Sequence, residues 1–404
     1  YEALYPPRQL KEGARVTRFA PSPTGFLHFG NLFTCLISYK IAKSTDGIFY
    51  VRVEDTDQKR KVDGAVEVML RGLSYYGIKP DEGVIAENEE KGIYGPYKQS
   101  ERKDIYQAYA KQLVEEGLAY PCFCSEEELE RIRESQEHED IKGYYGEYAA
   151  CRNLSFEEIS KKIAAGEKWT LRLKSPGSID KKCVFEDMIK GKIEMPENVQ
   201  DIVLLKSDGI PTYHFASVVD DHLMRTTHIV RGDEWISSCP IHLQLNKLLG
   251  FKTPKFVHVA PIMKAEGEGK RKLSKRKDPE AAVTYYSEQG YPSESVNEYM
   301  MTLANSNFED WRRANKAEDI NKFPFNIKKM SVSGALFDIA KLDDISKTVI
   351  SVMDCKKVFE LSHEWAKEYC EPLARLYEAD FEYATAILNI DRGNKKPRKD
   401  IAKW

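Results

Sequence analysis

Two short segments that lie far apart in the chain contain side chains suited to binding a triphosphate. Residues 21–31 read PSPTGFLHFGN and lead into residues 32–42, an almost wholly apolar run of helical length. The start of such a helix offers backbone N–H groups, here at Gly30 and Asn31, and the positive end of its dipole to a phosphate. His28, just before that point, could donate a hydrogen bond to a phosphate oxygen in a transition state. Residues 270–277 read KRKLSKRK, with six cations in eight positions.

Together the two segments predict an ATP site more strongly than either does alone. Short Gly/Pro segments recur by chance, so residues 21–31 could be a stiff loop with a surface histidine, and a run of charges is usually a solvated face. Residues 270–277, however, follow a strand-like stretch at 256–263 and a predicted Gly-Glu-Gly hinge at 267–269. A flexible loop that carries several lysines could neutralise the charge that develops on a departing pyrophosphate.

The elements around the first segment indicate an α/β nucleotide-binding fold. Residues 15–20 have strand composition, and a second strand is predicted at 47–53, followed by a helix from 63 toward 76. Another helix is predicted to begin at Ser100 and to stop before Gly117.

The pattern changes from about 118 to 200, where short helices alternate with strand pieces. Two capping boxes mark helix starts in this region, Ser125-x-x-Glu128 and Ser155-x-x-Glu158. Strand patterns at 203–205 and 227–231 then return to the α/β core, so the nucleotide fold is predicted to be split by an insertion. After about 252 the chain becomes mostly helical.

Composition is typical of an enzyme with several domains. A chain of 404 residues is expected to form about two to four domains. With 61 basic and 64 acidic residues, any RNA contact must come from local patches such as 270–277 or 392–403. No stretch can span a membrane, no signal peptide is visible, and the eight cysteines are scattered, so a reducing, cytoplasmic location is expected. The first residue is Tyr1 and not Met, which indicates that the start is missing.

Several segments, in this order, resemble the glutamyl-tRNA synthetases, which are class I aminoacyl-tRNA synthetases: residues 17–31, 51–57, 95–102, 203–216, 218–224, 230–235 and 272–276. The resemblance covers about residues 15 to 345. It implies an ATP-dependent ligase that joins L-glutamate to tRNA(Glu) through a glutamyl-adenylate and releases AMP and pyrophosphate. ATP, L-glutamate and tRNA(Glu) are then the partners, Mg²⁺ accompanies ATP, and a monomer is expected.

The resemblance also implies an α/β architecture with a split Rossmann-like class I synthetase catalytic domain, an inserted acceptor-binding domain and a mostly helical C-terminal part. The expected ranges are the two catalytic halves at 13–117 and 201–251, the inserted tRNA acceptor-binding domain at 118–200, a stem-contact domain with the lysine loop at 252–340, and a helical anticodon-binding region, which could be incomplete, at 341–404.

The glutamate pocket is predicted from charge and from the family match. Holding a side-chain carboxylate calls for arginine in fork geometry, and Arg18 and Arg231 lie at the carboxyl ends of predicted strands, where α/β sheets bind ligands. Glu54 and Tyr213 would take the ammonium. The resemblance places these four residues in the glutamate site together with Ala20, Ser22 and Ser217. Two structural alternatives stay open: Arg18 and Arg52 could pair with neighbouring carboxylates, and Arg231 could brace the fold through Asp233 or Asp220.

Activation needs no protein nucleophile, because the substrate carboxylate attacks the α-phosphorus of ATP directly and the enzyme positions and stabilises charge. The predicted catalytic residues are His28, Asn31 and Lys275. Asn31 stands where the family usually has a histidine, and its amide can still donate to a phosphate or ribose oxygen. The predicted ATP-binding residues are Thr24, Gly25, His28, Gly30, Asn31, Glu234, Lys272, Ser274 and Lys275.

Three cysteines in the insertion match the thiolates of a zinc site found in many family members. Cys122 and Cys124 form a Cys-x-Cys pair, and Cys151 follows twenty-seven residues later. Structural zinc takes four ligands, so a Zn²⁺ site needs one more. Tyr148 is the predicted fourth ligand, and the other possibilities are Tyr145, Glu147 and His138. Three free, half-buried thiols are the alternative without a metal.

Two other functions are compatible with parts of the sequence. A short paralogue that glutamylates a modified tRNA base has a similar LHFG string, but it lacks residues corresponding to 280–404 and usually keeps a weaker lysine loop. A non-catalytic RNA-binding zinc module would not need His28, Lys275 and Arg231. An assay of ATP–pyrophosphate exchange separates this last alternative from the enzyme.

Overall fold

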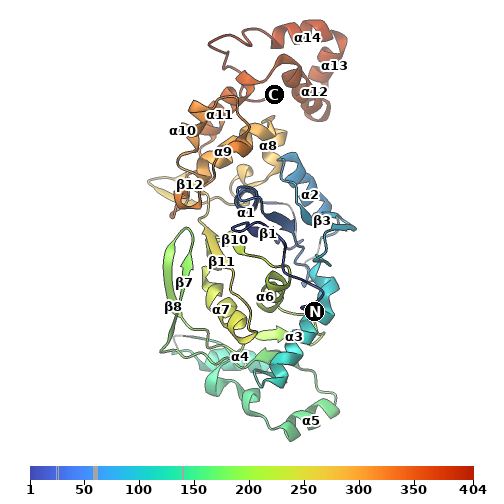
Figure 1. The fold of residues 1–404 in the computed structure, drawn as a ribbon, viewed down its shortest axis with the longest axis vertical. Coiled ribbons are helices and arrows are strands. Elements are labelled where there is room, and N and C mark those ends of the chain that lie inside the picture. The colour runs from blue at the N-terminus through green and yellow to red at the C-terminus, as the bar shows by residue number, and fades with distance from the viewer. Residues whose placement is uncertain (24, 26, 58–61, 139–140) are drawn as a thin grey trace.

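The computed structural model describes residues 1–23, 25, 27–57, 62–138 and 141–404. The molecule is elongated, with an α/β body in the middle (Figure 1). Residues of the insertion form one end, around helix α5 (Phe156–Ala164), and the C-terminal helices form the other end. The predicted α/β class with a helical C-terminal part is confirmed.

Two four-stranded sheets form the body. In the first, β1 (Val16–Phe19), β2 (Ile48–Val51) and β3 (Glu82–Ala86) are parallel and β4 (Glu89–Lys91) is antiparallel to β3. The second has the order β10 (His228–Gly232), β11 (Lys255–Val259), β7 (Lys182–Asp187) and β8 (Gly191–Pro196). The two sheets meet where Thr227 donates its N–H to the Val16 carbonyl, 3.0 Å away, so β1 and β10 are neighbours.

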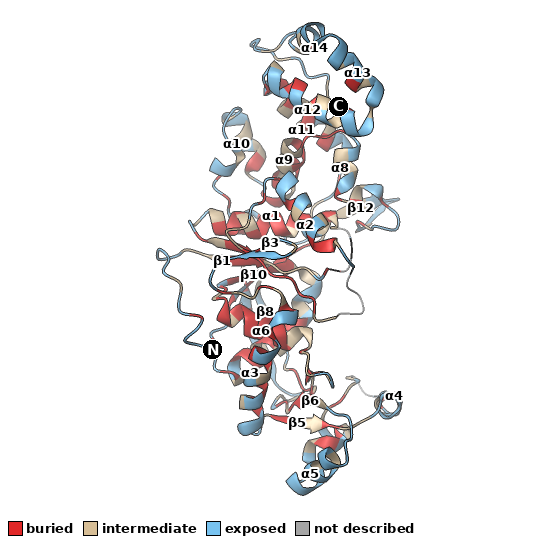
Figure 2. Cartoon of the chain, turned by 90° about the vertical axis from the view of Figure 1, so that its right-hand side faces the viewer, coloured by how far each residue is buried: buried red, intermediate tan, exposed pale blue. Residues whose placement is uncertain are grey.

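Helices cover both sides of these sheets, as an α/β fold requires. Figure 2 shows α1 (Phe29–Lys43) and α2 (Ala65–Tyr75) on one side, and α3 (Lys103–Glu115) and α6 (Tyr213–Leu223) on the other. Helix α7 (Cys239–Leu248) packs against α6. The predicted helix after Ser100 is confirmed, and Gly117 follows it with a positive φ of 72°, as a C-terminal stop requires.

The insertion has its own three-stranded antiparallel sheet of β5 (Ala119–Cys122), β6 (Thr170–Leu173) and β9 (Val203–Leu205). Both predicted capping boxes are present, at the starts of α4 (Glu126–Ser135) and α5. The strands are, however, exchanged relative to the predicted ranges. The hairpin of β7 and β8, from the range predicted for the insertion, extends the sheet of β10 and β11, while β9, from a range predicted for the catalytic half, pairs with β6. Strand pairing depends on long-range partners that local patterns do not identify.

The C-terminal part begins with the hairpin of β12 (Met263–Glu266) and β13 (Gly269–Lys272), and the predicted hinge at 267–269 is its turn. The lysine segment is therefore partly a strand and not a loop throughout. The helices that follow are α8 (Thr284–Glu288), α9 (Ser293–Ala304), α10 (Phe308–Ala314), α11 (Ile339–Val352), α12 (Cys355–Tyr369), α13 (Glu371–Ala379) and α14 (Phe381–Leu388).

This part is joined to the α/β body at the start of α1. The ring of Phe29 packs against Tyr286 at 4.9 Å and against Phe337 at 5.9 Å between ring centroids. A backbone bridge links His28 to Ala282. The apolar contacts thus bring the two segments that sequence analysis paired, 21–31 and 270–277, to the same place. No helix in the described ranges is both long and apolar enough to cross a lipid bilayer.

Candidate active site

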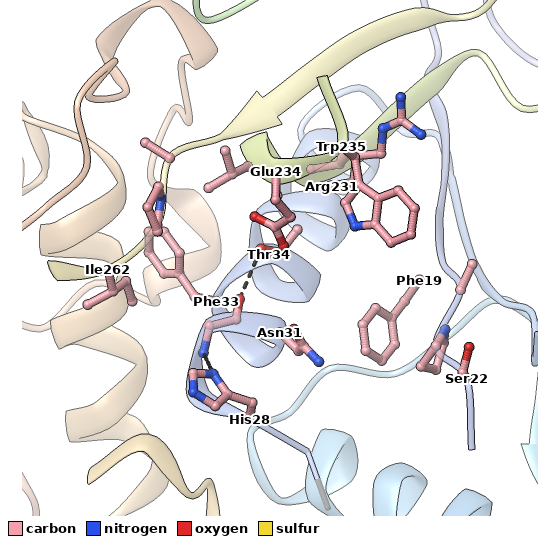
Figure 3. A pocket seen from close by; sticks show the side chains of 18 of the residues that line it. Phe19, Ser22, His28, Asn31, Phe33, Thr34, Arg231, Glu234, Trp235 and Ile262 are labelled. Carbon is pink, nitrogen blue, oxygen red and sulfur yellow. Dashed lines mark hydrogen bonds between the residues drawn. The ribbon is translucent and has the colours of Figure 1, made fainter. Parts of the chain in front are cut away.

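A cavity of about 530 Å³ opens at the carboxyl ends of β1 and β10, beside the start of α1. Parallel strands place their loops at this edge, which is where α/β sheets bind ligands. Figure 3 shows His28 and Asn31 near one end of the cavity and Arg231 and Trp235 near the other. The predicted residues that line it are Arg18, Ala20, Ser22, His28, Gly30, Asn31, Glu54, Tyr213, Arg231, Glu234 and Lys272.

His28 is the N-cap of α1. Its Nδ1 accepts the N–H of Gly30 at 2.9 Å, so the ring proton lies on Nε2, which is left as a donor. Burial lowers the pKa of His28, and the charges of Lys275 and Lys272 lower it further, which favours this neutral tautomer. The sequence-based expectation that the Gly30 and Asn31 amides are unpaired is wrong, because the Asn31 N–H donates to the His28 carbonyl at 2.9 Å. A phosphate here would meet side chains and the helix dipole.

The lysine segment lies over the start of α1. Lys272 lines the main cavity, and its Nζ is 3.4 Å from Glu234 Oε2. Lys275 lines a smaller adjoining cavity of about 110 Å³, together with Gly25 and Asn31. The lysines that sequence analysis selected therefore face the same helix start as His28.

The turn after Lys272 is held in shape by an acid at its end. Asp278 accepts the N–H of Ser274 at 2.9 Å and forms two bonds with the Arg271 guanidinium, at 2.6 and 2.8 Å. The pKa of Asp278 is lowered, chiefly by Arg271. Ser274 supports the turn and is not among the residues that line either cavity. Thr24, a predicted ATP-binding residue, lies outside the described residues.

Arg18 lines the cavity but already has an acidic partner. Its Nε and Nη2 donate to the two carboxylate oxygens of Asp221, at 2.9 and 3.2 Å. The alternative that Arg18 and Arg52 pair with neighbouring carboxylates is therefore observed. Arg52 donates to Asp221 and to Glu54, each at 2.9 Å. Ser217 is fully buried behind the cavity, 3.4 Å from the Arg52 guanidinium.

Arg231 differs from these arginines. Within the described part of the chain no carboxylate lies within ion-pair distance of its guanidinium, although the side chain is only 6% exposed. The two acids proposed as structural braces are engaged elsewhere: Asp233 with Lys190 at 3.1 Å, and Asp220 with Arg102 at 2.7 Å. The hypothesis that Arg231 braces the fold by pairing with Asp233 or Asp220 is therefore wrong.

Two aromatic side chains complete this end of the cavity. Tyr213 packs on Trp235 with ring centroids 4.7 Å apart and lines the cavity together with Arg231. Burial raises the pKa of Tyr213, and nearby Glu54 adds to the effect. Burial also raises the pKa of Glu54, against the opposing effect of Arg52. The cavity is thus lined by the guanidinium of Arg231 and, beside Tyr213, by the carboxyl group of Glu54.

The three cysteines of the insertion converge. The Sγ atoms of Cys122, Cys124 and Cys151 all lie within 4.8 Å of one another, and Cys124 and Cys151 are 3.7 Å apart. Thiolates bound to one tetrahedral zinc ion at about 2.3 Å would be about 3.8 Å apart, so the donor set fits this metal. Hydrogen bonds from Cys124 and Cys151 lower the pKa of the Cys122 thiol.

The hydroxyl of Tyr144 lies 3.3 Å from Cys124 Sγ. Sequence analysis did not consider Tyr144. Its hydroxyl oxygen also accepts the N–H of Cys151 at 2.9 Å, which fixes its direction. The assignment of Tyr148 as the fourth ligand stays a prediction.

Other residues of the site were missed from the sequence. Phe19, Phe33, Trp235 and Pro261 line the cavity, and Asp221 lies behind it. The run Val218-Val-Asp-Asp221 was quoted as part of the family pattern, and only its Asp220 was considered as a partner, for Arg231. Two adjacent acids on a helix with many apolar positions are a usable signal, because buried acids need cationic partners.

Comparisons with known proteins agree with this geometry. Residues 15–344 match the family model for tRNA synthetases class I (E and Q), catalytic domain. A glutamate–tRNA ligase of Clostridium perfringens is 53% identical over 100% of this chain and 74% of its own length. The corresponding ligase of Acetivibrio thermocellus is 50% identical over 99% of this chain and 73% of its own length. The crystal structure of a glutamate tRNA ligase from Elizabethkingia meningosepticum, in complex with its amino acid, superposes with a TM-score of 0.80 at 33% identity, covering 93% of this chain and 76% of that one.

Proposed function

The chain belongs to the class I tRNA synthetases of the glutamate and glutamine group, and we propose that it is a glutamate–tRNA ligase, which joins L-glutamate to tRNA(Glu) in an ATP-dependent reaction. The reaction passes through a glutamyl-adenylate and releases pyrophosphate and AMP. Similarity to glutamate–tRNA ligases over 99–100% of this chain argues against both a shorter paralogue and a non-catalytic module.

The observation that carries the choice of amino acid is the buried guanidinium of Arg231 in the same cavity as the His28 turn. A buried cation without an acidic partner in the described chain is costly unless a ligand supplies the charge. The side-chain carboxylate of glutamate supplies it, whereas the amide of glutamine does not. Arg18, whose charge is already balanced by Asp221, contributes an N–H edge to the same cavity.

The remaining groups of glutamate are assigned by charge. Glu54 and Tyr213 receive the ammonium group, with Ala20 and Ser22 along the side of the cavity. The α-carboxylate then points toward the start of α1, where it attacks the α-phosphorus of ATP. Because the attacking oxygen belongs to the substrate, the protein contributes positioning and charge stabilisation.

The triphosphate is assigned to the region between α1 and the lysine segment. The Nε2–H of His28 and the amide of Asn31 donate to phosphate oxygens, and Lys272 and Lys275 balance the charge of the leaving pyrophosphate. Mg²⁺ arrives with the phosphates of ATP and neutralises part of their charge. Gly25, Gly30 and Glu234 border the same space.

The insertion is assigned to the acceptor end of tRNA, and the helices after residue 252 to the rest of the tRNA. Zinc bound by Cys122, Cys124 and Cys151 would order the insertion. A monomer in the cytoplasm, where tRNA is charged for translation, agrees with this role.

The test of the amino-acid assignment is Arg231→Gln, which keeps polarity and approximate size but removes the charge. We expect kcat/KM for glutamate in ATP–pyrophosphate exchange to fall by two to three powers of ten, or about 3–4 kcal/mol, with a smaller preference over glutamine. Arg313→Gln, at an exposed arginine of α10, is the matched control. A folded Arg231→Gln protein that keeps the glutamate preference would refute the assignment.

A further inference from the structure

Arg231 is held by uncharged groups that come from several elements. Its Nε donates to Nε2 of His258 at 3.1 Å, its Nη1 is 3.5 Å from Nδ1 of His242, and its Nη2 donates to Sγ of Cys239 at 3.4 Å. The exposed fractions of these three side chains are at most 1%.

Three other buried arginines of the body are held differently. Arg18, Arg52 and Arg102 each form an ion pair with Asp221 or Asp220 at 2.7–2.9 Å. The contrast within one core shows that the fold can supply acids to arginines. At Arg231 it supplies imidazoles and a thiol.

The proton positions on His258 follow from its second partner. Its Nδ1 is 2.7 Å from Oδ2 of Asp187, so the proton lies on Nδ1 and Nε2 is free to accept from Arg231. Asp187 is the last residue of β7 and is itself fixed, because it accepts the backbone N–H groups of His258, Ile189 and Lys190 at 2.9–3.0 Å. A residue from the insertion range therefore sets the tautomer of a histidine on β11, the strand that pairs with β10.

The imidazoles stay neutral in this setting. Burial lowers the pKa of His242 well below its ordinary value, and the charge of Arg231 lowers it further. Burial also lowers the pKa of His258, against the opposing hydrogen bond to Asp187. On its far side His242 meets His214, whose Nδ1 is 3.1 Å from His242 Nε2. The two imidazoles that contact the Arg231 guanidinium therefore carry no charge.

From this arrangement we infer that His258, His242 and Cys239 are positioning residues that aim Arg231 by neutral hydrogen bonds, and that Asp187 fixes the His258 tautomer this requires. The guanidinium is thereby fixed in direction while its charge is left for the side-chain carboxylate of the substrate. An internal acid would fix the arginine equally well but would take the place of that carboxylate. The inference rests on the proposed glutamate site and explains how its selectivity is maintained.

The first test supplies an internal acid. Cys239→Asp places a carboxylate beside Nη2 at the first turn of α7, where the helix dipole tolerates it. Cys239→Asn has the same size without the charge. We expect KM for glutamate to be at least a hundredfold higher in the Asp variant than in the Asn variant, with KM for ATP within about threefold between the two. Equal glutamate KM values in two folded variants overturn the inference.

The second test reads the tautomer directly. In ¹⁵N NMR spectra of the imidazoles at neutral pH, assigned with a His258→Gln variant, we expect His258 to be neutral with its proton on Nδ1. Asp187→Asn should change this tautomer and raise the glutamate KM at least tenfold with kcat changed less. Glu186→Gln, at the exposed neighbour on β7, should change neither. A doubly protonated His258 would overturn the inference that Asp187 positions Arg231 through the His258 tautomer. An Asp187→Asn protein with unchanged tautomer and KM would overturn it as well.

The two proposals fail separately. If Arg231→Gln removes the glutamate preference while Cys239→Asp and Cys239→Asn behave alike, the assignment of the glutamate site stands. The inference that neutral hydrogen bonds keep the charge of Arg231 available to the substrate is then wrong. If Arg231→Gln keeps the preference, the assignment of the pocket itself is wrong.

Discussion

Asp221 is the acid on which the wall of the amino-acid pocket depends, and Asp221→Asn tests this. The carboxylate is 2% exposed and accepts three N–H groups, from Arg18 at 2.9 and 3.2 Å and from Arg52 at 2.9 Å. Burial alone would raise the pKa of Asp221, but Arg18 and Arg52 lower it, so the group is ionised at neutral pH. An asparagine keeps the shape and removes the charge.

The cost follows from these three bonds. The amide oxygen can keep the two bonds made by Oδ1, which change from charge-assisted to ordinary and lose about 1 kcal/mol each. The amide nitrogen replaces Oδ2 and points a donor at Arg18 Nη2, so the third bond is lost at about 1.5–3 kcal/mol. The total, about 3.5–5 kcal/mol, lies within the usual cost of about 3–5 kcal/mol for removing one partner of a buried ion pair.

Urea denaturation followed by circular dichroism measures this free energy of unfolding, and ATP–pyrophosphate exchange measures the pocket. We expect the glutamate KM to rise as well, because Arg18 lines the cavity. The control is Asp46→Asn, whose exposed pair with Lys11 should contribute little. A loss of less than about 1 kcal/mol for Asp221→Asn would show that the network does not bear the stability assigned to it.

Three further outcomes are expected. Lys275→Ala should slow adenylate formation by about 2–4 kcal/mol in single-turnover experiments with little change in glutamate binding, and an unchanged rate would contradict its role. Metal analysis of protein prepared without chelator should find about one zinc per chain, and its removal should harm tRNA charging more than pyrophosphate exchange; zinc-free protein would reject the site formed by Cys122, Cys124 and Cys151. The pKa of His214 is lowered from 6.5 to about 4, chiefly by burial and then by the charge of Arg231. As the pH falls, the unfolded chain therefore binds a proton at this histidine before the folded chain does. The free energy of unfolding should fall between about pH 6.5 and pH 4, by up to about 3 kcal/mol from this group. His214→Asn should flatten that part of the stability curve in urea titrations at several pH values, and an unchanged slope would refute this.

Local patterns in the sequence determined much of the fold. The capping boxes at Ser125 and Ser155, the stop at Gly117 and the apolar run at 32–42 were all confirmed, because caps, stops and apolar periodicity act over a few residues. The order of the motifs was enough to identify the family, since each motif is a local string.

The sequence also selected most residues that line the cavity, because they lie at strand ends and at one helix start. It did not reveal how their charges are balanced. Arg18 and Arg231 look equivalent in the sequence, and only the packed structure distinguishes them: α6 brings Asp221 to Arg18, whereas α7 and β11 bring neutral groups to Arg231.

Tertiary structure alone decided the pairings between distant segments. The hairpin ending at Asp187 joins the catalytic sheet, Tyr144 reaches the cysteine cluster, and His28 caps its own helix while residue 282 pairs with it. The physical reason is that a strand edge, a charged side chain or a hydroxyl bonds to the partner that the folded core places within about 3 Å of it. That partner comes from a distant segment, so the local sequence does not identify it. What each residue can do chemically is set by its type; which of these possibilities it realises is set by packing.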